Sequence, residues 1–294
     1  MSVERFHWDE DSVPRFWDRV AETRLRELSF GRFAARSLLL ACRRHLAPTG
    51  IHLDLGAGDG DLTAALAGEG YRVRAFEPSP VRRQTLGRRL AGLEAFAGFD
   101  EGDASGHYDV VLLCEVIEHV LEPQLDDFLR MLARRVRAGG TLIVTTPNAE
   151  DLELGSAICP SCGLLFHRWQ HQTSFTGESL RARLEGVGFD TLAVHQLEFS
   201  ERFYLPYADY LTGARAVPRR SRARSALRRL AGAYRCLQGR PVRPEDRHGT
   251  SADRGDVLGI EVSDYVADIV GDRDARVGAG SNLLYVGRRR DDAA

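Results

Sequence analysis

Lysine is absent from this 294-residue chain, so all 40 basic residues are arginine, and they are offset by 42 acidic residues. The resulting net charge of −2 disfavours a chain whose whole surface binds nucleic acid. The five cysteines are too few and too scattered for a disulfide scaffold. Because no long apolar run is present either, we expect neither a signal peptide nor a membrane span, and a cytoplasmic location.

A short apolar run with strand character, residues 51–55, leads into a turn with glycine at alternate positions: Gly56, Gly58 and Gly60. An alanine- and leucine-rich pattern of helical character follows it. Strand, glycine turn and helix predict the first half of a βαβ unit. No Gly-Lys-Ser/Thr follows, which argues against a P-loop, and Gly-x-Gly-x-Gly differs from the Gly-x-Gly-x-x-Gly of dinucleotide-binding folds.

An acidic residue, Asp54, precedes the first glycine inside this strand. Residues 53–60 therefore resemble the first motif of class I S-adenosylmethionine (SAM) methyltransferases. The resemblance implies an α/β fold in which a seven-stranded, mostly parallel sheet carries helices on both faces. It also implies that the methionine and ribose parts of SAM are held by Asp54, Gly56, Ala57, Gly58 and Gly60.

Three further carboxylates are candidates for binding the nucleoside of SAM. Glu77 ends the second predicted strand, residues 71–76, where a carboxylate can accept hydrogen bonds from both hydroxyls of a ribose. A weak third strand, residues 93–97, is followed by Asp100 and Asp103. Either could accept from the adenine amino group, and the sequence does not choose between them.

The fourth predicted strand, residues 108–114, leads into Glu115, Glu118 and His119, which would share one face of a helix. This Glu-x-x-Glu-His element resembles the signature of two groups of methyltransferases: the O-methyltransferases of ubiquinone biosynthesis and the 2′-O-methyltransferases of small-RNA 3′ ends. In those relatives the triplet is associated with a divalent metal, which implies a magnesium-type ion here. In the alternative, Glu115 contacts SAM while Glu118 and His119 only cap and pack.

A Cys-x2-Cys-x4-His-x3-His pattern follows the fifth strand, residues 141–146, and precedes a helix at 176–186. Cys159, Cys162, His167 and His171 could form a tetrahedral, structural zinc site within a lid at residues 155–175. The alternative is a reduced cysteine pair with two loop histidines. Without zinc, His171 could meet Glu118 and His119 from above.

Four segments are expected along the chain: an N-terminal helical cap at 1–47, divided at Gly31, the SAM-binding core at 48–200, an insertion at 201–279, and the last core strand with a tail at 280–294. The last strand, residues 282–287, is expected to pair with a sixth strand at 191–199 and to insert beside the fifth. Arginine dominates residues 215–247 of the insertion, which could contact an anionic membrane or a polyanionic substrate. A helix packed on the core with a solvated face is the alternative.

Transfer of a methyl group from a sulfonium needs a positioned acceptor and removal of its proton. His119 is the first candidate for the general base, with Glu118 beside it, and His167 and His171 follow. The acceptor is expected to be an oxygen on a small molecule or a glycan. The alternatives are RNA 2′-O-methylation, disfavoured by net acidity, and a SAM-binding scaffold without turnover.

Overall fold

The structure, a computed structural model, describes residues 3–102, 108–197 and 282–291. The chain divides into two units, Met1–Phe199 with Val277–Ala294, and Ser200–Arg276. The second unit lies outside the described residues, and with it the arginine-rich 215–247 segment. The segment boundaries and the membrane contact expected from the sequence therefore stay predictions.

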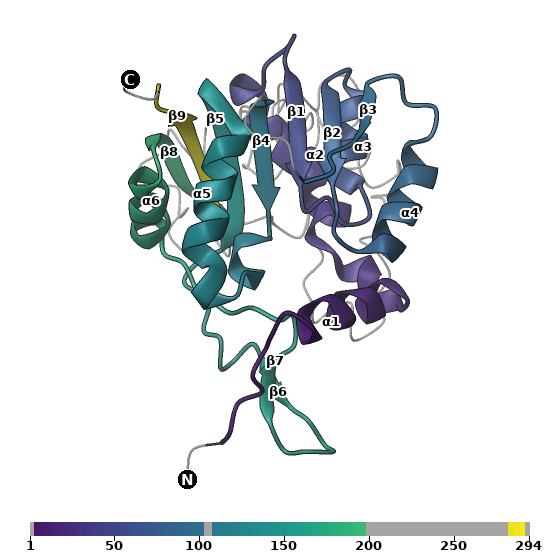
Figure 1. Cartoon of the computed structure of the whole chain (residues 1–294), viewed down its shortest axis with the longest axis vertical. Coiled ribbons are helices and arrows are strands. Elements are labelled where there is room, and N and C mark those ends of the chain that lie inside the picture. Colours follow the sequence, from purple (N-terminus) through teal and green to yellow (C-terminus); the bar gives the residue numbers. More distant parts are fainter. Residues whose placement is uncertain (1–2, 103–107, 198–281, 292–294) are drawn as a thin grey trace, which may run out of the picture. The chain divides into compact units, whose positions relative to one another are not determined.

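The first unit is built on one seven-stranded sheet in the order β3-β2-β1-β4-β5-β9-β8 (Figure 1). Its strands are β1 Ile51–Leu55, β2 Arg72–Phe76, β3 Phe96–Phe99, β4 Tyr108–Cys114, β5 Val136–Pro147, β8 Phe189–Leu197 and β9 Asn282–Arg289. Strands β3, β2, β1, β4 and β5 pair in parallel, and β9 pairs antiparallel with both β5 and β8. The predicted fold class is confirmed, as is the insertion of the last strand beside the fifth.

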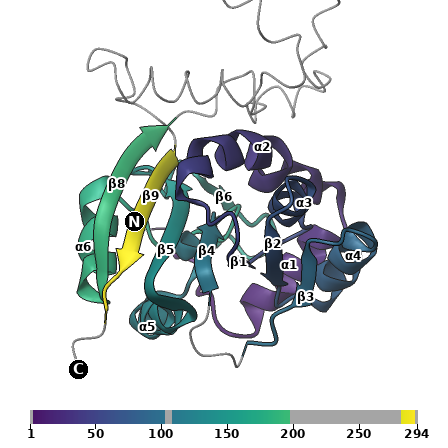
Figure 2. The same cartoon turned by 90° about the horizontal axis from the view of Figure 1, so that it is seen from above.

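Helices lie on both faces of this sheet (Figure 2). They are α1 Ser12–Ala21, α2 Phe30–Cys42, α3 Asp61–Gly68, α4 Pro80–Leu90, α5 Leu125–Arg135 and α6 Gly177–Gly186. Short 3-10 helices are η1 Arg24–Leu28, η2 Arg43–His45, η3 Ile117–His119 and η4 Glu122–Gln124. Among the described residues, no helix is long and apolar enough to cross a membrane.

The core forms where α5 packs on the central strands and α6 on β8 and β9. Leu125, Leu129 and Leu132 recur at helical spacing on α5 and are buried against Val111 of β4 and Val144 of β5. Strand β4 is apolar along most of its length because it is covered on both faces. This packing fixes the carboxyl ends of the parallel strands, which is where ligands bind in open α/β sheets.

Several boundaries differ from the sequence prediction, including that of the sixth strand, which is Phe189–Leu197 and not 191–199. Gly31 lies inside α2, because the break between the first helices comes earlier, at η1, where the Thr23 side chain accepts from Leu25 N–H. The fifth strand begins at Val136 and not at the predicted 141, because Val136 already pairs with Tyr108 of β4. The third strand is Phe96–Phe99, shifted towards the carboxyl end from the predicted 93–97.

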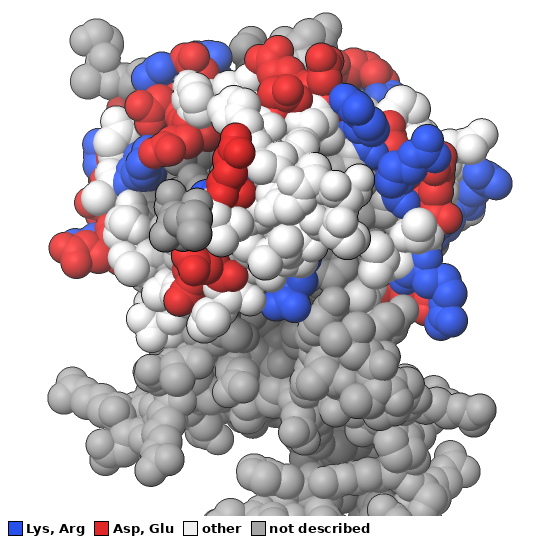
Figure 3. Space-filling view, turned by 90° about the horizontal axis from the view of Figure 1, so that it is seen from below, with Lys and Arg blue, Asp and Glu red and all other residues white. Residues whose placement is uncertain are grey.

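The segment expected as a lid contains a β-hairpin, β6 Ser156–Ile158 and β7 Leu165–His167, which projects beyond the sheet (Figure 1). The N-terminal segment continues it, since Arg5 pairs in parallel with Leu165. The adjoining face, seen from below in Figure 3, mixes arginine and acidic side chains around an uncharged area. The described residues of that face form no continuous basic surface.

Candidate functional site

The glycine turn after β1 has the backbone conformation that its sequence predicts. Gly56, Gly58 and Gly60 have φ angles of 85°, 56° and 80°, a region that residues with side chains rarely adopt. The N–H groups of Gly56 and Ala57 both donate to the carbonyl of Phe76, each at 2.9 Å. The turn is therefore preformed and tied to the end of β2. At Gly56 an added Cβ would lie 2.5 Å from Val116 Cγ2, so this turn also packs against the segment after β4.

Glu77 secures the same turn from β2. One carboxylate oxygen accepts from Gly58 N–H at 2.7 Å, and the other accepts from Ser79 N–H at 2.9 Å. Glu77 is buried, and burial raises the pKa of its carboxyl group. Each oxygen keeps a second lone pair, so the predicted contact with a ribose is chemically compatible with this arrangement and stays a prediction.

Asp54 lies beneath the turn and is buried. It accepts a hydrogen bond from the Thr63 hydroxyl of α3 at 2.6 Å, which joins β1 to the helix after the turn. Burial raises the pKa of Asp54 to about 6. The structure thus gives Asp54 a bracing role, whereas its predicted contribution to SAM binding is not tested.

Asp100 follows β3 but is engaged within the protein. Its carboxylate pairs with Arg135 of α5 and accepts from the Tyr108 hydroxyl and, at 2.8 Å, from Gly102 N–H. Burial raises the pKa of Asp100, but these hydrogen bonds outweigh burial and hold the pKa below its ordinary value. Binding of adenine by Asp100 stays a prediction, and Asp103 lies outside the described residues.

The segment after β4 does not form the helix that the Glu-x-x-Glu-His spacing predicts. Glu115 has a φ of 52°, and only Ile117–His119 form a single 3-10 turn, η3. Glu115 therefore turns towards Asn282 of β9, whose side-chain amide donates to both carboxylate oxygens at 3.2 and 3.3 Å. Burial raises the pKa of Glu115 to about 7. The expected metal set of Glu115, Glu118 and His119 needs correction, because Glu115 is not part of the group that converges.

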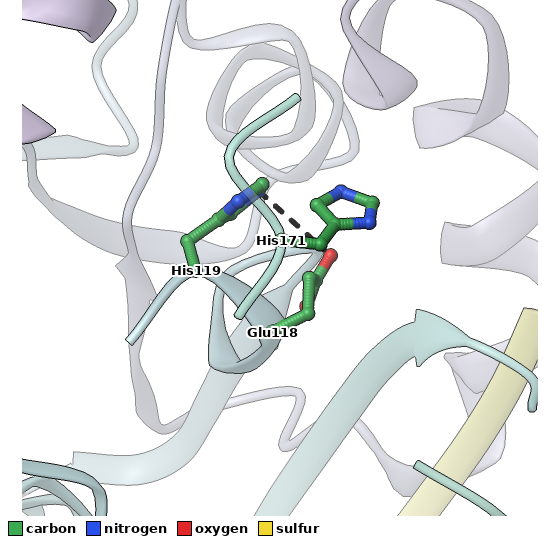
Figure 4. A group of neighbouring side chains, drawn as sticks. All are labelled: Glu118, His119 and His171. Carbon is green, nitrogen blue, oxygen red and sulfur yellow. Dashed lines mark ion pairs between the residues drawn. The ribbon is translucent and has the colours of Figure 1, made fainter. Parts of the chain in front are cut away.

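His171 takes the place of Glu115 in that group. Glu118, His119 and His171 each offer one ligand atom, and these atoms lie within 4.8 Å of one another (Figure 4). Glu118 Oε2 accepts from the Thr146 hydroxyl of β5 at 2.9 Å, while Oε1 is 3.9 Å from His119 Nε2. Glu118 Oε1 and His119 Nδ1 are buried without a hydrogen-bond partner. The structure brings together the three residues predicted for catalysis.

Burial sets the charge state of this group. It raises the pKa of Glu118 well above its ordinary value, with the nearby Glu115 carboxyl adding to the effect. It lowers the pKa of His119 and of His171, so both imidazoles are neutral near pH 7. A buried carboxyl beside two neutral imidazoles can receive a cation or a proton.

A second group shares His171. Glu150, which follows β5, is hydrogen-bonded to His171 Nδ1 and lies 3.3 Å from His167 Nε2, and these three also offer ligand atoms within 4.8 Å of one another. The rings of His167 and His171 stack with centroids 4.3 Å apart. Although burial raises it, the hydrogen bonds from the two histidines lower the pKa of Glu150 to about 2.

The predicted zinc set of Cys159, Cys162, His167 and His171 is not formed. The cysteines lie in the turn at the tip of the β6–β7 hairpin, whereas His167 pairs with Ser156 at the opposite end. An antiparallel hairpin necessarily separates its turn from its base. Both groups able to hold a metal among the described residues contain histidines and carboxylates, without a cysteine.

Helix α1 contacts the site through Trp17, which lies against both His119 and Arg82. The Trp17 ring contacts the His119 ring edge to face at 4.8 Å and receives the Arg82 guanidinium at 4.9 Å from its centroid. The Trp17 indole N–H donates to Gln170, which in turn donates to the His119 carbonyl at 2.8 Å. Sequence reasoning missed Trp17, Gln170 and Glu150, because each acts through a residue distant in the chain. The only local signal was the position of Glu150 just after the fifth strand.

Comparison with known proteins agrees with this geometry. A family model described as a methyltransferase domain matches residues 25–194, more than half of the chain. The chain belongs to the methyltransferase domain family. This membership confirms the resemblance that the glycine turn carried.

Curated relatives match a shorter part of this methyltransferase-domain chain. The ubiquinone biosynthesis O-methyltransferase of Caulobacter sp. strain K31 is 38% identical over 103 residues, which is 33% of this chain and 40% of that protein. The human mitochondrial enzyme of the same name is 27% identical over 192 residues, covering 55% of this chain and 50% of its own length. The chain spans about 40% of the length of the curated relatives that it matches first.

Solved structures agree in fold. The [4+2]-cyclase SpnF matches with a TM-score of 0.58 at 17% identity and covers 99% of both chains. The Burkholderia thailandensis 1,6-didemethyltoxoflavin-N1-methyltransferase, solved with S-adenosylhomocysteine, has a TM-score of 0.53 at 15% identity and covers 99% of this chain and 95% of its own. Because a cyclase and a methyltransferase share this architecture, the reaction must be argued from the site.

Proposed function

We propose that this chain is a SAM-dependent methyltransferase that methylates a hydroxyl oxygen of a small molecule or glycan-type acceptor. One observation carries the proposal: His171 meets Glu118 and His119 of the segment whose Val116 packs against the glycine turn, and buried polar atoms of this group lack a protein partner. Orphaned buried polar atoms are rare in folded proteins, and they point to a ligand. The O-methyltransferase names of the curated relatives support an oxygen acceptor.

The glycine turn and Glu77 fit SAM. Among the described residues, an added Cβ at Gly58 would come within 4 Å of only Arg82 Nη1, at 3.4 Å, so protein atoms leave this space open. Glu77 lies beside it with lone pairs suited to a diol. When bound, SAM supplies a methyl group activated by its sulfonium. The residues of the chain would hold its methionine at the turn and its ribose at Glu77.

A divalent cation fits the converging group, held by Glu118, His119 and His171, and one carboxylate with two imidazoles suits a transition-metal ion better than Mg²⁺. The unpartnered Glu118 Oε1 is a hard oxygen ligand, and the two neutral imidazoles add nitrogen ligands. Such an ion would orient a hydroxyl and make its proton easier to remove. Burial disfavours the charged form of Glu118, and a bound cation would offset that cost.

Methyl transfer breaks the sulfur–carbon bond and forms a carbon–oxygen bond, so the proton of the hydroxyl must leave. When no cation occupies the converging group, His171 is the better proton acceptor of its two histidines, because an imidazole whose lone pair binds a cation cannot also accept a proton. Burial and the neighbouring His171 depress the pKa of His119 strongly, whereas the hydrogen bond to Glu150 partly restores the pKa of His171. Trp17 and Gln170 hold His119 in place, so that His119 can contact the acceptor or bind the cation.

Nothing among the described residues favours an RNA acceptor. The face that carries α1 has no continuous basic surface there, and the arginine-rich 215–247 segment lies outside the described residues (Figure 3). A scaffold that binds SAM without turnover would not need the converging group.

The test is methyl transfer from labelled SAM to phenols, catechols, sugar hydroxyls and a short RNA, with and without EDTA. We expect a labelled methyl ether of a non-RNA acceptor, loss of transfer in EDTA, recovery with Mn²⁺, and a SAM affinity that EDTA does not change. Glu118→Gln should reduce turnover, whereas the exposed Glu122→Gln should not. Transfer only to RNA would support the alternative acceptor, and SAM binding without any transfer would support a scaffold. Transfer indifferent to EDTA would remove the cation from the proposal.

A further inference from the structure

Glu150 holds two imidazoles with one carboxylate. Oε2 is hydrogen-bonded to Nδ1 of His171, and Oε1 lies 3.3 Å from Nε2 of His167. The carboxylate follows β5, whereas His167 ends β7 of the projecting hairpin and His171 follows it, so this contact joins the hairpin to the edge of the sheet. Because an ionised carboxylate only accepts hydrogen bonds, His171 Nδ1 must carry a proton, whereas His167 Nε2 is close to the carboxylate without forming a hydrogen bond.

The tautomer of His167 follows independently from its other nitrogen. His167 Nδ1 accepts backbone N–H groups from His171, at 3.0 Å, and from Trp169, at 3.3 Å. That nitrogen therefore bears the lone pair, and the proton of the neutral ring is on Nε2, which faces Glu150. The ring cannot move aside, because it is buried and fills the space that a side chain at Gly155 would need.

These tautomers separate the two groups that could hold a metal. In the group of Glu150, His167 and His171, the nitrogens that face the carboxylate are protonated, and a protonated nitrogen cannot bind a cation. In the group of Glu118, His119 and His171, the proton on His171 Nδ1 leaves a lone pair on Nε2. A carboxylate that holds one nitrogen of an imidazole fixes what the other nitrogen can do.

We propose that Glu150 is a positioning residue that keeps His171 in the Nδ1–H tautomer, so that Nε2 is the only ring nitrogen with a lone pair for the group of Glu118 and His119. His167 contacts the other oxygen of the same carboxylate and holds it in place. We call Glu150, His167 and His171 together the clamp. The use made of the Nε2 lone pair rests on the proposed function, whereas the tautomer of His171 does not. The clamp gives a role to two residues, Glu150 and His167, that stand outside the converging group.

Imidazole ¹⁵N NMR of the parent protein reads the tautomer directly. We expect His171 to be protonated on Nδ1 and His167 on Nε2. A His171 ring protonated on Nε2 in the parent overturns the proposal, whatever the variants do. This readout needs no SAM and no turnover, so it remains decisive if the proposed methyl transfer fails.

Three variants test the consequence for binding. Glu150→Ala removes both acceptors, Glu150→Gln keeps one acceptor oxygen, and Glu153→Ala removes a carboxylate whose side chain is 74% exposed on the same segment. Mn²⁺ is the probe. We expect its affinity to fall about 10- to 100-fold in Glu150→Ala, to fall less in Glu150→Gln, and to stay unchanged in Glu153→Ala. SAM affinity should stay near that of the parent in all three.

Spectra of the same variants complete the test. In Glu150→Ala the His171 signal should become a mixture of tautomers. A folded Glu150→Ala protein that keeps both the parent tautomer and the parent affinity for Mn²⁺ contradicts the clamp. If the parent binds no Mn²⁺, the cation leaves the proposed function, and the tautomer of His171 in parent and variant decides the clamp alone.

Discussion

Replacing Glu77 by glutamine separates the two roles that the structure combines in this side chain. The carboxylate accepts from Gly58 N–H and Ser79 N–H, one at each oxygen. A carboxamide has the same shape but only one acceptor oxygen, so one backbone N–H must face an N–H₂ group. Leaving such a buried donor unpaired costs about 1–3 kcal/mol, which should appear in the free energy of unfolding measured with urea.

The same substitution should weaken SAM binding by about 1–3 kcal/mol, since the turn loses its anchor and the ribose loses a charged acceptor. That loss is about a 5- to 150-fold rise in the calorimetric Kd. The exposed Glu69→Gln at the end of α3 is the matched control and should change neither quantity. A folded Glu77→Gln protein with the SAM affinity of the parent would refute the placement of the ribose at Glu77. Unchanged unfolding would refute the anchoring of the turn.

Two further predictions concern buried carboxylates. Burial raises the pKa of Asp54 to about 6, so the folded protein keeps this proton above the unfolded value of about 4. The stability that this group contributes is present below pH 4 and is lost as the pH rises to 6. The free energy of unfolding in urea, taken as the difference between the parent and Asp54→Asn, should therefore fall by roughly 1–3 kcal/mol between pH 4 and 6. A difference that does not change with pH would contradict the raised pKa. Arg135→Met leaves the Asp100 carboxylate buried without its cation and should cost about 3–5 kcal/mol, part of which Asp100→Asn in the same chain restores. If instead Asp100→Asn alone mainly weakens SAM binding and leaves unfolding unchanged, Asp100 serves adenine and not the fold.

The fold was largely predictable because its signals are local. The apolar run of β4 and the glycine turn after β1 each depend on a few neighbouring residues. Boundaries were less predictable where pairing decides them. Val136 joins β5 because it lies opposite Tyr108, and no feature of its own neighbourhood says so.

The site was predictable only in part. Glu118 and His119 were found because their spacing is a motif, yet Glu115 was misplaced because the spacing fits a helix and the backbone instead takes a φ of 52° at that residue. The zinc set failed for a related reason. Four ligand residues close in sequence, Cys159 to His171, are kept apart once an antiparallel hairpin forms between them. Contacts between distant segments, such as that between Trp17 and His119, leave no trace in the sequence.

The proposed function requires that the glycine turn binds SAM. Calorimetric titration of SAM into the parent and into Gly58→Val tests it most directly, because a branched side chain there must adopt a φ of 56° and enter the space left open beside Arg82. We predict saturable, one-to-one binding by the parent and none by the folded variant. A parent that does not bind SAM, or a folded variant that binds it equally well, would contradict the account.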